Sequence, residues 1–160
     1  MSNLSYPRLH PLGDAAWIVD FGSSIDETTH ERVMGLAQAL ADAQARGQWS
    51  AIVEWVPAYT SLTVHFSVDE TGDAAFDAAG ALLALARDTA PLSRPGRRWR
   101  LPVCFDAEFA PDLDELAQSR GLSPQQVVAL MTRTAFRVYM LGFQPGFPYM
   151  GGLPAALEQP

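Results

Sequence analysis

The sequence predicts an α+β protein in which a two-layer α/β sandwich, an antiparallel sheet covered by two helices, precedes the first part of a second domain. Up to residue 90, the predicted elements follow the order strand, strand, helix, strand, strand, helix. The apolar residues of each predicted helix form one stripe, which a sheet can cover. The turn-forming segment Pro91–Gly96 then separates a predicted domain of residues 1–90 from one of residues 97–160.

Two short strands and a helix open the first domain. Tyr6–His10 and Ala15–Phe21 are predicted strands on either side of a turn at residues 11–14. Ser24–Glu27 has the spacing of a capping box, which predicts the start of a helix, and Gly47 is placed to end it. The apolar stripe of this helix consists of Val33, Leu36, Ala37 and Leu40.

A hairpin and a second helix complete this domain. Ala51–Val56 is rich in β-forming residues, and Ser61–Val68 alternates apolar with polar residues, with His65 on the polar side. The short connection between these strands predicts an antiparallel hairpin. The second helix is expected to begin at a cap, Asp73, and to end near Arg87. Its predicted stripe consists of Phe76, Ala79, Leu83 and Ala86.

The second domain supplies fewer elements. Trp99–Phe105 predicts a strand, Asp112–Arg120 predicts a helix, and Ser123 is the predicted cap of another helix. Thr134–Leu141 alternates and predicts a second strand. From Gly142 onward glycine and proline are frequent, and no strand or helix signal remains. Two strands are too few to close a sheet, so we expect this domain to be truncated at the end of the sequence.

Composition and charge indicate a globular protein of the cytoplasm. Of the 160 residues 48% are hydrophobic, and a net charge of −7 argues against binding to nucleic acid. Neither a signal peptide nor an apolar run of about 20 residues is visible, so no membrane segment is expected. A single cysteine fits a reducing compartment.

The absence of lysine excludes several kinds of chemistry, because all 11 basic residues are arginine. A chain without lysine has no P-loop of the usual type, no Schiff-base nucleophile and no biotin-carrying side chain. Any reaction of this protein that uses ATP or biotin would therefore need those groups on another polypeptide.

Few side chains are candidates for catalysis or metal binding. His10, His30, His65 and Cys104 have no metal-ligand spacing, so no metal site is predicted. Cys104 lies in an apolar predicted strand, where a buried inert thiol is expected and a thiolate nucleophile is the alternative. His65 is either a surface residue or part of a partner-facing side of the sheet. Four arginines either decorate a solvated linker or form an anion site: Arg94, Arg97, Arg98 and Arg100.

The segment Phe143–Gly152 is the most distinctive part of the sequence. Three aromatic residues, two prolines and three glycines within ten residues disfavour a helix or a regular central strand. Its rings either plug the core of their own domain or face a ligand or partner, and we favour the second because its glycines permit close approach. The candidate binding residues are Phe143, Pro145, Gly146, Phe147, Tyr149, Gly151 and Gly152. No catalytic residue is assigned.

This segment also carries a resemblance to a known family. Residues 136–154, FRVYMLGFQPGFPYMGGLP, resemble the pattern YRVYxLGFxPGFPYLGGLP of the allophanate hydrolase subunit 1 family. That family includes a sporulation kinase inhibitor and the B subunit of 5-oxoprolinase. Shorter stretches that agree in order are Gly13–Ala16, Val56–Leu62, Pro102–Phe105 and Pro111–Leu113.

The resemblance implies a fold, partners and a reaction. It implies that the second domain is the N-terminal part of a cyclophilin-like β-barrel. One implied partner is of the type of the 5-oxoprolinase C subunit, which is also that of allophanate hydrolase subunit 2. The other implied partner is of the type of the 5-oxoprolinase A subunit. Such a complex opens 5-oxoproline to glutamate with ATP, and without lysine this chain is expected to bind no cofactor itself.

We therefore expect a non-autonomous subunit of an ATP-dependent 5-oxoprolinase-type amidohydrolase. One alternative is a regulatory protein that inhibits a sensor histidine kinase. Another is a subunit of the allophanate hydrolase or urea carboxylase type.

Two departures from the family pattern bear on function. The family commonly has a histidine shortly before the YRVY strand, whereas Met131 stands there in this sequence. Methionine cannot transfer a proton, so no acid–base role is expected at this position. The family chain also continues with PR-containing and PAGSVGI-like segments, which are absent from these residues.

Overall fold

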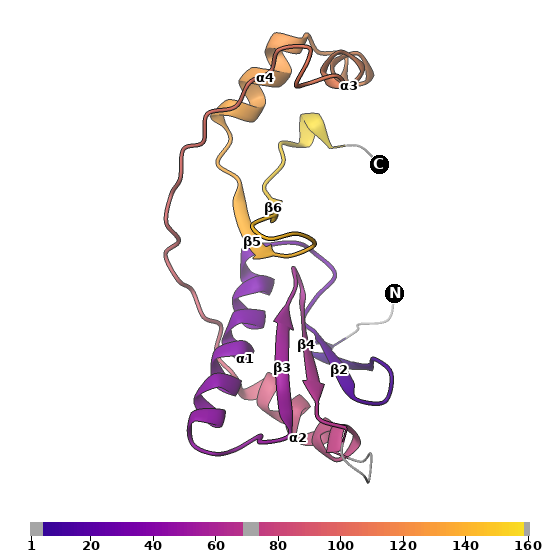
Figure 1. Ribbon diagram of the computed structural model, residues 1–160, viewed down its shortest axis with the longest axis vertical. Helices are drawn as coiled ribbons and strands as arrows, with labels where there is room; N and C mark the ends of the chain where they lie inside the picture. The colour runs from indigo at the N-terminus through magenta and orange to yellow at the C-terminus, as the bar shows by residue number, and fades with distance from the viewer. Residues whose placement is uncertain (1–4, 69–73, 159–160) are drawn as a thin grey trace. The chain divides into compact units, whose positions relative to one another are not determined.

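The computed structural model describes residues 5–68 and 74–158. The chain divides into two compact units, Met1–Arg94 and Pro95–Pro160, which we call unit 1 and unit 2 (Figure 1). The division falls within Pro91–Gly96, the segment expected to be a linker. Each unit has its own cluster of buried apolar residues. Independent folding of residues 1–90 stays a prediction.

A four-stranded antiparallel sheet of order β1-β2-β4-β3 forms one layer of unit 1. Its register places Val19 opposite Leu62 and Trp17 opposite Val64, so these apolar side chains share one face. The predicted hairpin is confirmed, because β3 and β4 pair directly and Ala58 N donates to Ser61 O at 2.8 Å. The strands are β1 (Arg8–Pro11), β2 (Ala16–Asp20), β3 (Ile52–Pro57) and β4 (Ser61–Phe66).

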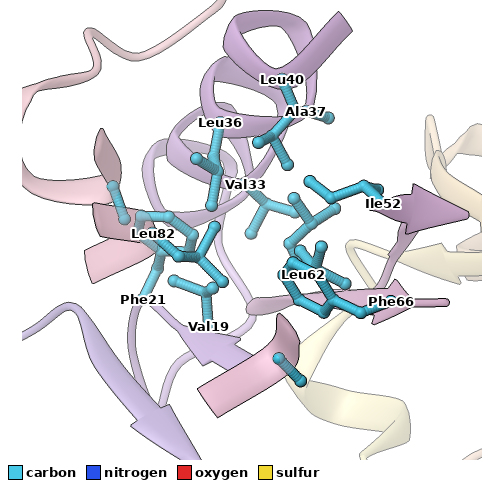
Figure 2. Packing of buried hydrophobic residues seen from close by; sticks show 13 residues of the cluster. Val19, Phe21, Val33, Leu36, Ala37, Leu40, Ile52, Leu62, Phe66 and Leu82 are labelled. Carbon is cyan, nitrogen blue, oxygen red and sulfur yellow. The ribbon is translucent and has the colours of Figure 1, made fainter. Parts of the chain in front are cut away.

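Two helices, α1 (Glu27–Ala45) and α2 (Ala74–Asp88), pack on this apolar face. Figure 2 shows side chains of α1 directed toward Val19, Leu62 and Phe66 of the sheet. The predicted stripe of α1 is confirmed, since all four of its residues are buried. The prediction of an antiparallel sheet with two helices on one face is therefore confirmed.

The predicted start of α1 is wrong by two residues. The N-cap is Asp26, whose carboxylate accepts hydrogen bonds from Thr29 N at 2.8 Å and from Thr29 Oγ1 at 3.0 Å. One carboxylate thus satisfies a free N–H of the first turn and a hydroxyl, and its charge is favourable at a helix N-terminus. Ser24 precedes the helix and is exposed.

The predicted stripe of α2 is confirmed at Ala86 and wrong at Phe76, while Ala79 and Leu83 are half-buried. Ala75, Leu82 and Ala86 are buried, whereas Phe76 is 76% exposed. Successive helical residues are about 100° apart, so a shift of one residue turns Phe76 outward. The indole N–H of Trp17 donates to Ala75 O at 2.6 Å and fixes this rotation. The predicted cap, Asp73, lies outside the described residues.

The first part of the predicted linker is attached to α1. Leu92 N donates to Glu31 O at 2.8 Å, and Arg94 Nη2 donates to Gln38 Oε1 at 2.5 Å. Between these contacts, the buried Gly35 of α1 faces the carbonyl of Ala90, which a Cβ at position 35 would overlap. Glycine therefore makes room for the chain that leaves α2.

Unit 2 consists of two helices, a hairpin and a single turn of 3-10 helix. The predicted end of the first helix at Gly121 is confirmed, and this glycine has φ 64°. The predicted start of the second helix is confirmed as well, because Ser123 is its N-cap and forms a capping box with Gln126. Asp112 is the N-cap of its helix, but its side chain makes no capping hydrogen bond. The elements are α3 (Leu113–Arg120), α4 (Pro124–Arg133), β5 (Arg137–Leu141), β6 (Pro148–Gly151) and η1 (Ala155–Leu157).

Three expectations for unit 2 are wrong. Trp99–Phe105 has no regular secondary structure, and Cys104 is exposed rather than buried. The region after Gly142 does contain regular structure, β6 and η1. Proline is tolerated in β6 because Pro148 is its first residue.

A small core and a two-stranded sheet hold the described part of unit 2 together. Ala117, Val127 and Leu157 form the buried cluster, which joins α3, α4 and η1. β5 and β6 form the second sheet of the described chain. The cyclophilin-like barrel stays a prediction.

Replacing Gly35 by alanine should destabilise unit 1 by about 1–3 kcal/mol, because the new methyl group overlaps the Ala90 carbonyl. Gly80→Ala in α2 is the matched control, since a Cβ there meets no atom within 4 Å. It should be neutral or gain up to about 1 kcal/mol from helix propensity. Urea unfolding followed by tryptophan fluorescence measures both, and equal midpoints for the two variants would show that position 35 has room for a side chain.

Candidate functional site

The candidate binding residues lie on the β5–β6 hairpin or at its tip. Val138 is opposite Met150, and Leu141 is opposite Pro148. The register shifts between Val138 and Met140, so Tyr139 is the extra residue of a β-bulge. Gly142 N donates to Phe147 O at 3.2 Å and closes the hairpin. A bulge of this kind bends its strand and increases the local twist.

Two tight turns form the tip. Phe147 N donates to Gln144 O at 3.0 Å across Pro145 and Gly146, and Gly146 has φ 80°. Proline followed by a glycine of positive φ is the arrangement of a type II β-turn. Gln144 N also donates to Gly142 O at 2.6 Å across Phe143, which has φ 62°. A hydrogen bond across a single residue that has a positive φ defines a γ-turn of the rare, strained type.

Three aromatic rings form a ladder along the hairpin. The ring centroids of Phe143 and Phe147 are 5.7 Å apart, and those of Phe147 and Tyr149 are 5.4 Å apart. Both pairs are edge-to-face, a favourable arrangement of aromatic rings. Phe143 is 80% exposed and Phe147 is 45% exposed, whereas Tyr149 is half-buried. The ladder therefore ends in solvent at Phe143.

Two glycines accommodate the tyrosine rings of the hairpin. A Cβ on Gly151 would lie 2.7 Å from Cε2 of Tyr139, and one on Gly142 would lie 3.3 Å from Cε2 of Tyr149. Gly151 thus serves ring packing within the hairpin. Gly142 has a similar contact with Tyr149 but was not among the predicted site residues, because nothing in the sequence indicates that the two are close. Gly152 has φ 92°, which only glycine adopts readily.

Apart from Arg137, the first residue of β5, the hairpin has no charged side chain. No Asp, Glu, Arg, Lys or His occurs between Arg137 and Glu158. Exposed apolar residues that are close together mark interaction sites on proteins. The exposed large apolar residues of this stretch are Val138, Leu141, Phe143, Phe147, Met150 and Leu153, and we call them the hairpin patch.

The histidines lie in unit 1 and do not converge. His10 Nε2 is 3.9 Å from Asp20 Oδ2, and His65 is on the face of β4 opposite the buried Leu62 and Val64 side chains. His30 is buried, with Nδ1 3.3 Å from Tyr59 O. Within residues 5–68 and 74–158, no three His, Cys, Asp or Glu side chains group as a metal site would require.

Two of the four arginines near the linker have contacts of their own. Arg94 binds Gln38, whereas the Arg97 guanidinium stacks on Trp99 at 4.3 Å. Met131, at the position of the family histidine, packs against the buried cluster of unit 2. In the part of the chain that the structure describes, no helix is long and apolar enough to cross a membrane.

Comparison of the sequence with known proteins identifies its relatives. The family model described as "Carboxyltransferase domain, subdomain C and D" matches residues 7–160. The chain is 33% identical over 165 residues to the 5-oxoprolinase B subunit of Bacillus subtilis and 32% identical over 153 residues to that of Escherichia coli O157:H7. In both cases the match covers 96% of this chain and 66% of the relative.

Solved structures resemble the chain as well. The crystal structure of TTHA0988 matches with a TM-score of 0.66 and 32% identity, over 91% of this chain and 27% of that one. The urea amidolyase of K. lactis matches with a TM-score of 0.59 and 17% identity, over 88% of this chain and 10% of that one, which shows likeness of fold.

The match of the family model over residues 7–160 places this α+β chain in the class of carboxyltransferase domains. The chain belongs to the family described as carboxyltransferase domain, subdomain C and D. The expected resemblance to the family of allophanate hydrolase subunit 1 and the 5-oxoprolinase B subunit is thereby confirmed.

Gly151→Ala should displace the Tyr139 ring and loosen the hairpin by about 1–3 kcal/mol, the usual effect of overpacking. Gly96→Ala is the control, since its Cβ would meet nothing within 4 Å. Hydrogen exchange of the Gly142 amide, which closes the hairpin, should be faster in Gly151→Ala alone. The same exchange rate in both variants would show that the Tyr139 contact does not stabilise the hairpin.

Proposed function

We propose that this chain is a non-autonomous subunit of a 5-oxoprolinase-type amidohydrolase, which opens 5-oxoproline to glutamate with ATP. It acts with two sister subunits. One is of the type of the 5-oxoprolinase C subunit (allophanate hydrolase subunit 2), and we call it the C-type subunit; the other is of the type of the 5-oxoprolinase A subunit. The observation that carries this proposal is the uncharged hairpin patch, whose exposed rings are suited to burial against another protein.

The names of the two curated relatives support the assignment. Both are B subunits of 5-oxoprolinase, and this chain is about one-third identical to each. The identity extends over nearly the whole of this chain. The match spans 66% of each relative, so the activity of the complete relatives is carried over as part of the proposal.

The residues of the chain support a role without chemistry of its own. It has no lysine to hold nucleotide phosphates. Its histidines and cysteine are dispersed between the two units, and Met131 stands where the family has a histidine. Binding of ATP and cleavage of the amide are therefore assigned to the assembled complex, in which this chain supplies a binding surface.

The hairpin patch is the proposed contact with a sister subunit. Phe143 and Phe147 are large and exposed, and aromatic residues commonly dominate the energy of protein interfaces. Pro145 and Gly146 form the turn between these two rings, and Gly151 of β6 leaves room for the Tyr139 ring. The rings are thus held in place before binding, which lowers the entropy lost on association.

Alone, the purified chain should release no glutamate from 5-oxoproline, with or without ATP. Mixing it with both sister subunits should produce ATP-dependent glutamate release, and leaving out any one of the three should abolish it. Turnover by this chain alone would contradict the proposal. Tight binding to a sensor histidine kinase, without glutamate release by the mixture, would support the regulatory alternative instead.

Phe147→Ala should weaken binding to the C-type subunit by about 2 kcal/mol, because a central ring of the hairpin patch is lost. The unfolding of unit 1 should not change, since Phe147 belongs to unit 2. Titration calorimetry and urea unfolding measure the two effects. A large loss of stability with unchanged affinity would show that Phe147 is a structural ring.

A further inference from the structure

We propose that unit 1 binds a small alkylammonium cation in the cavity between the turn that joins β1 to β2 and the first turn of α2. This site lies outside the hairpin patch and is independent of the proposed function. Three features support it: the size of the cavity, the aromatic residues that line it, and an acidic residue that has no partner among the described residues.

The cavity is of a size for a small ligand. Its volume is about 180 Å³. A buried apolar cavity of about 150 Å³ can hold benzene, so this space suits a ligand slightly larger than benzene. The residues that line it include Pro11, Asp14, Ala16, Trp17, Ala75 and Phe76. Apart from one acid, these side chains present mainly apolar surface.

Two of the lining residues are aromatic. The indole N–H of Trp17 donates to Ala75 O at 2.6 Å, which ties this ring to the first turn of α2. Phe76, the next residue of α2, is 76% exposed and is not among the residues that pack in the core of unit 1. Aromatic rings attract cations to their faces, and tryptophan does so most strongly. A cation that enters this cavity therefore meets a favourable wall.

Asp14 supplies a negative charge on a fixed turn. Among the described residues that line the cavity it is the ionisable one, and within residues 5–68 and 74–158 its carboxylate has no hydrogen bond or ion pair. The backbone on both sides of it is held, because Leu12 N donates to Ala16 O at 2.9 Å and Phe66 N donates to Ala15 O at 2.8 Å. A fixed carboxylate without a partner is suited to bind a cation with little loss of entropy.

The sequence that leads into α2 is acidic as well. Residues 66–86 contain no arginine, lysine or histidine, and their acids are Asp69, Glu70, Asp73 and Asp77. The N-terminus of a helix has a partial positive charge, which opposes a bound cation. Asp77 lies in the first turn of α2 and counters that charge. The charge balance of this region therefore favours cations over anions.

These features together select an alkylammonium ion. Its positive charge complements Asp14, and its alkyl groups suit the apolar and aromatic lining. A quaternary ammonium group has no N–H, so its burial leaves no donor without an acceptor. Choline is of the required size and serves as the probe.

Binding of choline to the full chain is followed by nuclear magnetic resonance. The indole N–H signal of Trp17, assigned with the variant Trp17→Phe, should shift with a dissociation constant of about 5 mM or lower. Dimethylbutanol, in which carbon replaces the nitrogen of choline, has the same shape without the charge. It should bind at least about fivefold more weakly, because the attraction to the rings and to Asp14 is lost. Sodium chloride keeps the ionic strength constant.

Two variants and two controls assign the binding to these residues. Asp14→Asn removes the charge and Phe76→Ala removes the exposed ring, and each should weaken choline binding by about threefold or more. Glu54→Gln is the charge control, since it removes an exposed acid of unit 1 that does not line the cavity. Phe109→Ala is the ring control, since Phe109 is 66% exposed and belongs to unit 2. Both controls should bind choline as the unaltered chain does.

Each part of the proposal has an outcome that contradicts it. A Trp17 signal that does not move at about 50 mM choline would overturn the site. Equal binding of dimethylbutanol would overturn the cationic class of the ligand. Undiminished binding in both Asp14→Asn and Phe76→Ala would overturn the assignment to this cavity. Equal losses in Asp14→Asn and Glu54→Gln would overturn the role of Asp14, because the net charge of the chain would then account for the effect.

Discussion

The packing of the Tyr139 ring on the backbone of Gly151 is the interaction on which the functional surface depends. A Cβ at position 151 would lie 2.7 Å from Cε2 of Tyr139, so a side chain there would require the ring to move. Tyr139 is also the bulged residue, so the ring contact with Gly151 lies where the register of the two strands shifts. Beyond the bulge, Gly142 accommodates Tyr149 in a similar way. These contacts support the tip on which Phe143 and Phe147 are presented.

The unusual composition of the glycine-rich segment reflects structural roles of several of its residues. Pro145 and Gly146 make the reversal of direction, and Gly151 makes room for a ring. The aromatic residues divide between the two roles, because Tyr149 is half-buried against the hairpin while Phe143 extends into solvent. The half-buried Tyr149 thus has a place in the packing of the hairpin, whereas a binding role for the exposed rings is part of the proposed function. A rigid support with an exposed ring at its end is well suited to a binding element.

Local signals in the sequence predicted those features that depend on neighbouring residues. The apolar spacing of α1 and the cap at Ser123 involve residues within one or two turns, and both are confirmed. The face of α2 was predicted correctly at Ala86 but not at Phe76, because the alanine-rich sequence offers two similar stripes and the hydrogen bond from Trp17 holds Ala75 toward the sheet. The strand β6 was hidden by its glycine and proline content. The left-handed backbone at Phe143 has no signal at all, since residue type predicts positive φ mainly for glycine.

The proposed role of this chain is to present a preformed aromatic hairpin to a sister subunit, and amide exchange tests that claim directly. Exchange is compared by mass spectrometry between the free chain and its complex with the C-type subunit. We predict that slowing on binding is concentrated in residues 137–153, the two strands and tip of the hairpin and the residues just beyond them. Slowing confined to the sheet or helices of unit 1, with residues 137–153 unchanged, would contradict this role.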